Sequence, residues 1–243
     1  MSEKSKAIFC WSGGKDSAFC LSQVLDEGHY DVQYLLTTLN DPLKRISMHG
    51  IREEILDRQA ASIDIPLLKV RVSGSTNAEY EKQMELVLKN VQSSGIHHVI
   101  FGDIFLEDLR AYREQNLDKI GMKAVFPLWK AETKEIIKEF IRRHFQAIVC
   151  CTNDRYLGKD WLGRKIDASF LTDLPDGVDP CGENGEYHTL CYEGPIFKNK
   201  INVTVGDTVF QPLVLSNLDH SQDNFPATRG FWYCDLLPTD KSL

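Results

Sequence analysis

Six consecutive residues near the N-terminus have the types and the spacing of an anion-binding loop. They are Ser12, Gly13, Gly14, Lys15, Asp16 and Ser17. Two adjacent glycines let the backbone turn tightly and bring its N–H groups close to an anion. The lysine adds a full positive charge, and the serines add hydroxyl donors. The spacing is neither that of the Walker loop, G-x-x-x-x-G-K-[ST], nor G-x-G-x-x-G, so we expect a phosphate-binding loop of another kind rather than a plain Gly-Gly turn with a capping serine.

A second polar cluster, residues 179–189 with the sequence DPCGENGEYHT, combines turn residues with the start of a predicted strand. Strand alternation would place Glu186 and His188 side by side on one face. A carboxylate beside an imidazole can orient a nucleophile or take a proton from it, and carboxylates can hold magnesium. By composition alone, a solvated Glu–His pair at a hairpin tip is an equally good interpretation.

Short apolar runs alternate with amphipathic stretches from Ala7 to about Cys151, which predicts a mostly parallel sheet with helices on both faces. We expect strands over 7–11, 32–39, 66–72, 98–101, 124–126 and 147–150, and helices over 15–27, from 51, over 77–94, over 106–119 and around 136–145. The loop then joins the first strand to the first helix. There the carboxyl end of the strand and the positive end of the helix both favour a bound anion.

The pattern changes after Asn153. Helical periodicity fades, glycine, proline and aspartate become frequent, and strand-like runs cover 187–192, 201–205, 208–215 and 230–237. We therefore expect a larger unit of residues 1–153 that carries the loop, and a smaller, strand-rich C-terminal subdomain of residues 154–243 that carries the second cluster.

The 243 residues carry a net charge of −7, which argues against a broad nucleic-acid-binding surface. We expect no signal peptide, because the start is polar, and no membrane span, because no apolar run is long enough. The seven cysteines are an odd number without a CxxC spacing, so we interpret them as reduced thiols of a cytoplasmic protein. Any special role of Cys181 and Cys191 is left open.

Together the two motifs resemble the diphthine–ammonia ligases and their relatives, a branch of the N-type ATP pyrophosphatases in the PP-loop superfamily. The resemblance extends over most of the chain and also rests on 48–50, on 102–103 and on 127–129. It implies an α/β, Rossmann-like (HUP-type) domain over 1–153 that binds ATP with Mg²⁺. It also implies a reaction that splits ATP into AMP and pyrophosphate.

The resemblance implies a role for each matching residue. The nucleotide would contact Ser12, Gly13, Gly14, Lys15, Asp16, Ser17, His49, Gly50, Gly102 and Asp103, with Asp16 as a magnesium ligand. The catalytic residues would be Lys15 at the departing pyrophosphate, Glu183 as a ligand of magnesium or substrate, and Glu186 with His188 at the acceptor end. Plainer interpretations stay open for two of these, a surface histidine for His49 and a helix cap for Asp103.

The second motif departs from the diphthamide-forming pattern, Gly-Glu-Gly-Gly-Glu-Phe-Glu-Thr, at Asn184 and His188, and Cys181 replaces a small residue. This form resembles a bacterial subgroup for which a role in cobalamin precursor salvage has been proposed. We expect a ligase that adenylates a carboxylate for attack by ammonia or another amine. The expected acceptor is a small molecule or a corrinoid rather than a protein, no membrane or nucleic-acid partner is expected, and a homodimer is left open.

Two other functions fit the loop. A PP-loop RNA-modifying enzyme would adenylate a tRNA base, but the acidic balance and the lack of a CxxC weigh against it. A non-catalytic nucleotide sensor needs only to hold nucleotide, and the pair Glu186 and His188 would then be superfluous.

Overall fold

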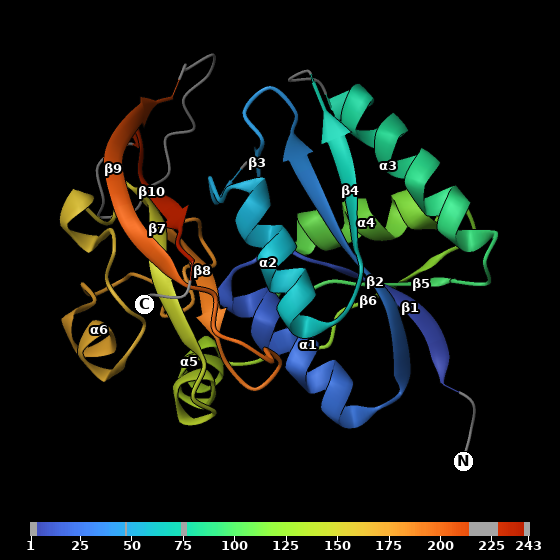
Figure 1. The fold of residues 1–243 in the computed structure, drawn as a ribbon, viewed down its shortest axis with the longest axis horizontal. Helices are drawn as coiled ribbons and strands as arrows, with labels where there is room; N and C mark the ends of the chain where they lie inside the picture. The colour runs from blue at the N-terminus through green and yellow to red at the C-terminus, as the bar shows by residue number, and fades with distance from the viewer. Residues whose placement is uncertain (1–3, 47, 74–76, 214–227, 241–243) are drawn as a thin grey trace.

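Two sheets stand side by side in the computed structural model, a six-stranded sheet and a four-stranded one (Figure 1). The structure describes residues 4–46, 48–73, 77–213 and 228–240. In this part of the chain, no helix combines the length and the apolar character that crossing a bilayer requires.

The first sheet contains β1 (Ser5–Cys10), β2 (Tyr30–Asn40), β3 (Arg45–Ile46), β4 (Leu67–Val72), β5 (His98–Ile100) and β6 (Lys123–Val125). Its strand order is β3-β2-β1-β5-β6, and β4 also pairs with β2. Every pairing is parallel except that of β2 with the short β3. The predicted α/β class with a mostly parallel sheet is confirmed.

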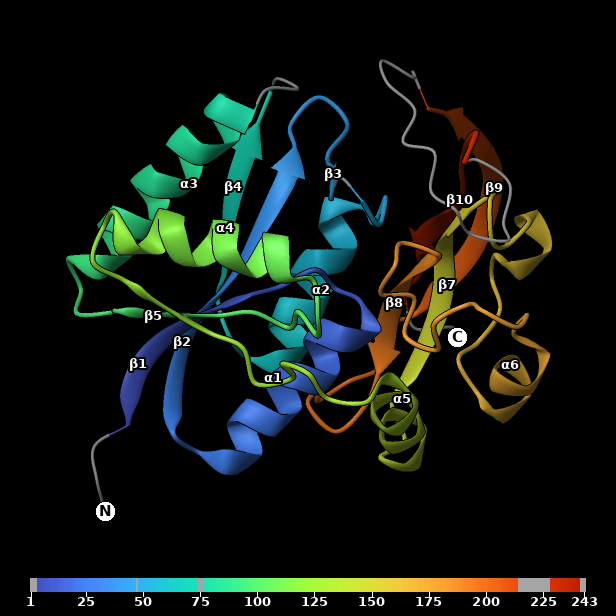
Figure 2. The same cartoon turned by 180° about the vertical axis from the view of Figure 1, so that it is seen from behind.

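Helices cover both faces of this sheet. The helices α1 (Lys15–Glu27) and α2 (Glu53–Ile63) share one hydrophobic cluster with Phe9 of β1, whereas Ile8 belongs to the cluster under α3 (Asn77–Gln92) and α4 (Glu107–Asp118). Figure 1 shows α2 in front of the sheet, and Figure 2, from behind, shows α4 in front. Strand alternation therefore separates the two helical layers.

The second sheet is antiparallel throughout, with the order β8-β7-β10-β9. Its strands are β7 (Gln146–Asn153), β8 (Tyr187–Glu193), β9 (Val203–Pro212) and β10 (Gly230–Pro238). The flanking helical segments are α5 (Thr133–Arg142), the 3₁₀ turn η1 (Lys159–Trp161) and α6 (Ala168–Asp173). The predicted strand-rich C-terminal part is confirmed.

Two details of the predicted strands were wrong. The strand at 147–150, expected in the parallel sheet, is β7 of the antiparallel sheet; a continuous apolar run does not tell which sheet will bury it. The runs 201–205 and 208–215 form one strand, β9, because Gly206 continues the strand instead of turning it; residues 214 and 215 lie outside the described residues. The division of the chain near Asn153 stays a prediction.

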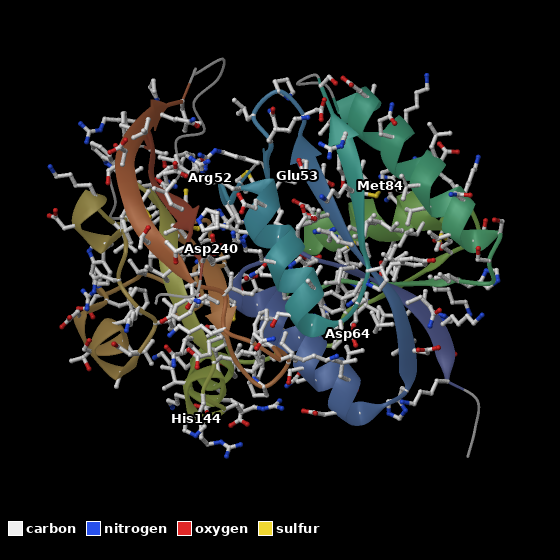
Figure 3. The ribbon with its side chains drawn as sticks, viewed as in Figure 1. Arg52, Glu53, Asp64, Met84, His144 and Asp240 are labelled. Carbon is white, nitrogen blue, oxygen red and sulfur yellow. The ribbon has the colours of Figure 1, made fainter. Side chains whose placement is uncertain are left out.

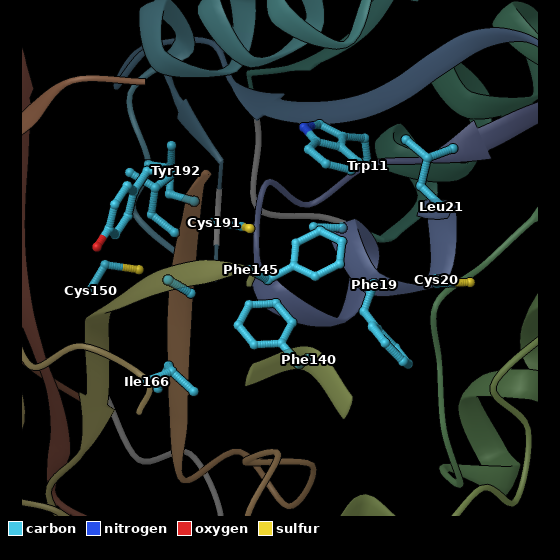
Figure 4. Packing of buried hydrophobic residues seen from close by; sticks show 14 of the residues in the cluster. Trp11, Phe19, Cys20, Leu21, Phe140, Phe145, Cys150, Ile166, Cys191 and Tyr192 are labelled. Carbon is cyan, nitrogen blue, oxygen red and sulfur yellow. The ribbon is translucent and has the colours of Figure 1, made fainter. Parts of the chain in front are cut away.

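A continuous hydrophobic core connects the two sheets (Figure 4). Phe19 of α1 meets Phe145 edge-on, with ring centroids 6.2 Å apart, and Phe145 stacks on Phe140 of α5 at 5.0 Å. The two sheets therefore share apolar packing directly behind the loop that follows β1.

Candidate functional site

The predicted anion loop joins the end of β1 to the start of α1. Gly13 has a φ of +77°, and a Cβ there would lie 2.8 Å from Oε1 of Gln59, so glycine is required for both conformation and space. Ser12 Oγ donates to Ser17 Oγ at 3.0 Å, and Ser17 Oγ donates to the carbonyl of Gly14 at 3.0 Å. The residue before α1, Gly14, has no side chain that could cap the helix, and the positive end of the helix faces the loop.

Gln59 holds this loop from behind, a role that the sequence did not reveal. Its amide donates to the carbonyls of Gly13 at 3.0 Å and Cys191 at 2.6 Å, and its oxygen accepts from Trp11 Nε1 at 3.0 Å. The side chain is fully buried. The available signal was a glutamine on the apolar face of α2, beside Leu56 and other buried positions of that helix.

Lys15 connects the loop with the second motif. Its side chain is buried, and its Nζ lies 2.7 Å from Oδ2 of Asp16, donates to the carbonyl of Cys181 and stands 5.1 Å from the ring centroid of Tyr187. Burial is the largest single influence and opposes the charge of Lys15, but Asp16, Tyr187 and Cys181 together outweigh it and raise the pKa of the lysine. Residues far apart in the sequence thus meet around one buried cation.

Glu186 braces the second motif from within. Its carboxylate is fully buried and accepts hydrogen bonds from the backbone of Asp179 at 2.9 Å, the backbone of Asn184 at 2.9 Å and the Asn184 side chain at 3.0 Å. These bonds close the turn from 179 to 186 and occupy both carboxylate oxygens. The predicted contact of Glu186 with an acceptor stays a prediction, and the geometry favours a positioning role.

Glu183 lies within the electric field of several other carboxylates. Burial first, and then the charge of Asp16, raise the pKa of Glu183 to about 8, against the opposing effect of Lys15. A nearby cation would stabilise the charged form of Glu183, which burial and the neighbouring carboxylates disfavour. Among the described residues, no group of three or more His, Cys, Asp and Glu side chains could hold a metal ion by itself. The donors Asp16 and Glu183 do fit a magnesium ion whose other ligands are phosphate oxygens and water.

A cavity of about 110 Å³ lies between the first sheet and the helices α3 and α4. Cys10 at the end of β1, Phe101 just beyond β5 and Leu36 within β2 line it, together with Tyr80 and Met84 of α3 and Tyr112 and Arg113 of α4. This is the edge at which parallel sheets bind ligands.

Asp103, one of the predicted nucleotide-binding residues, is fixed beside this cavity by Arg113. Nε of Arg113 lies 2.7 Å from Oδ2 of Asp103, and the guanidinium stands 4.2 Å from the ring centroid of Phe101. Arg113, which lines the cavity, thus holds Asp103 next to it. Burial raises the pKa of Asp103, and Arg113 opposes this shift.

His49 and His188 face each other beside the loop, and neither lines the cavity. Their ring centroids are 4.6 Å apart, and a Cβ on Gly14 would lie 3.0 Å from Nε2 of His49. Gly50 has a φ of +67° and packs against Tyr233 of β10. The structure thus places the predicted residues His49 and Gly50 toward the second sheet, away from the cavity lined by Cys10.

Comparisons with known proteins point to one family. The model of the diphthamide synthase N-terminal domain matches residues 5–124, and that of the diphthamide synthase C-terminal domain matches residues 132–215. The diphthine–ammonia ligases of Bos taurus and Homo sapiens are each 26% identical to this chain, over 95% of it and 91% of their own length. That of Danio rerio is 27% identical over 95% of both chains.

One solved structure shares a weaker likeness. It is the U34-tRNA thiolase NcsA from Methanococcus maripaludis with its [4Fe-4S] cluster, at 14% identity and a TM-score of 0.34, over 58% of this chain and 57% of the thiolase. A similarity of this size carries no functional argument.

Proposed function

Because the chain belongs to the diphthamide synthase, or diphthine–ammonia ligase, family, we propose that it converts a carboxylate into an amide at the site around Lys15. Its activity is that of an ATP-dependent, AMP-forming ligase that makes carbon–nitrogen bonds. The observation that carries the proposal for the site is the contact between the two motifs. The buried Lys15 of the loop reaches the carbonyl of Cys181 and the ring of Tyr187.

The cavity under α3 and α4 is our candidate for the adenosine site. Its walls are mainly apolar and aromatic, with polar groups such as Arg113 at the side, as purine-sized ligands require. Gly102 packs closely against the start of α1, since a Cβ there would lie 3.4 Å from the carbonyl oxygen of Asp16. A nucleoside in the cavity is thus next to the loop, and we propose Cys10, Leu36 and Gly102 as its contacts in place of His49 and Gly50.

The loop would hold the β,γ-phosphates of ATP. The positive end of α1 and the charge of Lys15 would stabilise the negative charge that develops on the departing pyrophosphate. Asp16 and Glu183 would be the protein ligands of magnesium, which when bound supplies positive charge to the phosphate oxygens. Arg113 would position Asp103 without touching the reacting atoms.

Adenylation makes the acceptor reactive. A carboxylate repels nucleophiles and has no good leaving group, whereas its mixed anhydride with AMP can lose AMP readily. Ammonia would then attack the carbonyl carbon, a carbon–nitrogen bond would form, and the bond to the AMP oxygen would break. The acceptor would lie on the side of the second sheet, near the turn that Glu186 holds in place.

For the acceptor we propose the carboxylate of diphthine, which the names of the relatives give as their substrate. Asn184 and His188 depart from the diphthamide-forming pattern in this region. A different carboxylic acid is therefore the other outcome to test. The comparisons do not support the cobalamin-related acceptor that the sequence suggested.

The test is the release of AMP and pyrophosphate from ATP, with magnesium, ammonium chloride and a panel of acids that includes diphthine. Lys15→Ala should lower the rate on the order of 10²–10³-fold. The matched control Lys138→Ala changes an exposed lysine of α5 and should leave the rate unchanged. A Lys15→Ala protein with the wild-type rate would refute the loop assignment. Tight ATP binding without AMP formation across the panel would favour a nucleotide sensor instead.

A further inference from the structure

The facing imidazoles of His49 and His188 carry unused hydrogen-bonding capacity. Nδ1 of His49 and Nε2 of His188 are both shielded from solvent, and neither has a hydrogen-bond partner in the described part of the chain. Buried polar atoms nearly always have a hydrogen-bond partner, so an unpaired one indicates a place where a ligand can bind. Here two such atoms occur on rings that touch each other.

The backbone of both histidines is in contact with the thiol of Cys150. The thiol of Cys150 lies 3.3 Å from the carbonyl oxygen of His49 and 3.5 Å from that of His188. Burial raises the pKa of Cys150 well above its usual value, so this sulfur keeps its proton and serves as a donor. Gly50, the residue after His49, packs against the ring of Tyr233. The two rings are therefore pre-positioned.

Both rings are neutral at physiological pH. Burial lowers the pKa of His188 to about 4, with a further contribution from Lys15. Burial, then the neighbouring His188 and Lys15, lower the pKa of His49 well below its usual value. A neutral imidazole offers one lone pair and one N–H group. Two of them suit a small neutral molecule that both donates and accepts, and the nearby charge of Lys15 disfavours a cation there.

We infer that His49 and His188 form the binding site of ammonia, the nitrogen donor of the ligase reaction. The inference rests on the proposed function. The pair lies close to the phosphate loop, since Nε2 of His49 is the ring nitrogen next to Gly14, and the unpaired Nδ1 of His49 and Nε2 of His188 remain for a ligand. In the reaction, the nitrogen lone pair attacks the carbonyl carbon of the acyl-adenylate, AMP leaves with its oxygen, and one proton passes from the nitrogen to the free ring nitrogen of His188.

The test follows the ring nitrogens directly by NMR on full-length protein with isotope-labelled histidine. Ammonium chloride is titrated at constant pH, and sodium chloride at equal concentration is the control. We expect saturable shifts of the His49 and His188 ring signals with ammonium chloride only, and none at the exposed His97. In His188→Leu, the loss of one hydrogen bond should weaken the apparent affinity about tenfold. His97→Leu should bind as the wild type does.

The wild-type titration decides the matter even if a variant does not fold. Equal responses to the two salts, or no response of His49 and His188, would overturn the inference. The release of pyrophosphate is measured separately, so the two ideas can fail separately. If pyrophosphate is released but ammonia does not bind at the pair, the proposed ligase reaction stands and the ammonia site is refuted. If ammonia binds saturably in a protein that never forms AMP, the ammonia site stands and the proposed reaction is refuted.

Discussion

The backbone N–H of Lys15 donates a 3.0 Å hydrogen bond to the side-chain oxygen of Thr189. The first residue of α1 is thereby tied to β8 of the other sheet. In addition, the backbone N–H of Cys191 donates to the carbonyl of Gly13 at 2.9 Å. Hydrogen bonds from both sheets thus fix the phosphate loop. Substitutions in β8 that remove these bonds should therefore weaken the binding of the nucleotide.

Replacing Thr189 with valine tests this coupling. The substitution keeps the shape of the side chain but leaves the N–H of Lys15 buried without an acceptor. We expect the free energy of unfolding to fall by about 1–3 kcal/mol, and ATP binding to weaken because the loop loses a fixed point. Urea unfolding and ATP titration measure the two effects. Thr208→Val, at an exposed position of β9, is the control; equal behaviour of the two variants would contradict the coupling.

Glu186→Gln should act on the turn rather than on the nucleotide. In the wild type, the backbone N–H groups of Asp179 and Asn184 each donate to one oxygen of Glu186. A glutamine has only one acceptor oxygen, so its NH₂ group would face one of these N–H groups and leave it without an acceptor. We expect a loss of about 1–3 kcal/mol in unfolding free energy, slower AMP formation and nearly normal ATP affinity. Glu27→Gln at the exposed end of α1 serves as the comparison. A collapse of ATP affinity in Glu186→Gln would show that the turn also supports the loop.

The helices and strands around the first sheet were predictable where residues such as glycine mark their ends. The helix α1 begins and ends at the predicted residues, because it starts after Gly14 and stops at Gly28, which has a φ of +67°. The loop between β1 and α1 was predictable for the same reason. The short β3 carried no signal, since two residues are too few to show a period.

The parts of the site that depend on tertiary contacts were beyond the sequence. The place of Gln59 on the apolar face of α2 indicated burial, but not that its amide bonds to Gly13 and Cys191. Strand alternation did not reveal that the Glu186 carboxylate folds back onto its own turn. Arg113 of α4 contacts Asp103 and the ring of Phe101, which follow β5. This contact depends on how α4 packs on the sheet, which the sequence pattern does not show.

Asp235→Asn should loosen the connection between β10 and the segment that carries His49. Asp235 accepts from Arg52 Nε at 2.9 Å and from Arg45 Nη2 at 2.8 Å, and Figure 3 shows Arg52 at the start of α2, on the side of the second sheet. We expect a loss of about 1 kcal/mol in unfolding free energy, a low value because the groups are partly exposed. Thermal unfolding measures it, and Asp240→Asn, at a fully exposed carboxylate, is the control.

The effect of Asp235 should depend on pH in one direction. The hydrogen bonds from Arg52 lower the pKa of Asp235 to about 2, from an ordinary value of 3.8. A lowered pKa means that the contribution is complete above the ordinary value and is lost as the pH falls toward 2. The difference between wild type and Asp235→Asn should therefore shrink across this acid range. A constant difference would show that the carboxylate charge contributes nothing.

Glu183 should have the opposite dependence on pH. Its pKa in the folded chain is about 8, against an ordinary value of 4.5. Between these values the native state holds a proton that the unfolded chain has lost, so the unfolding free energy of the wild type should fall as the pH rises. Glu183→Gln cannot titrate, and its stability relative to the wild type should increase across the same interval, by up to about 5 kcal/mol. Urea unfolding at a series of pH values measures this difference.

Binding of magnesium and ATP should lower the raised pKa of Glu183. If the ion lies beside Asp16 and Glu183, its charge lowers the pKa of Glu183, and the carboxyl releases its proton when the complex forms. Calorimetry of MgATP binding near neutral pH, in buffers of different ionisation enthalpy, should show this proton release in the wild type and not in Glu183→Gln. Equal proton release by both proteins would place the ion elsewhere and leave Asp16 as the carboxylate to test next.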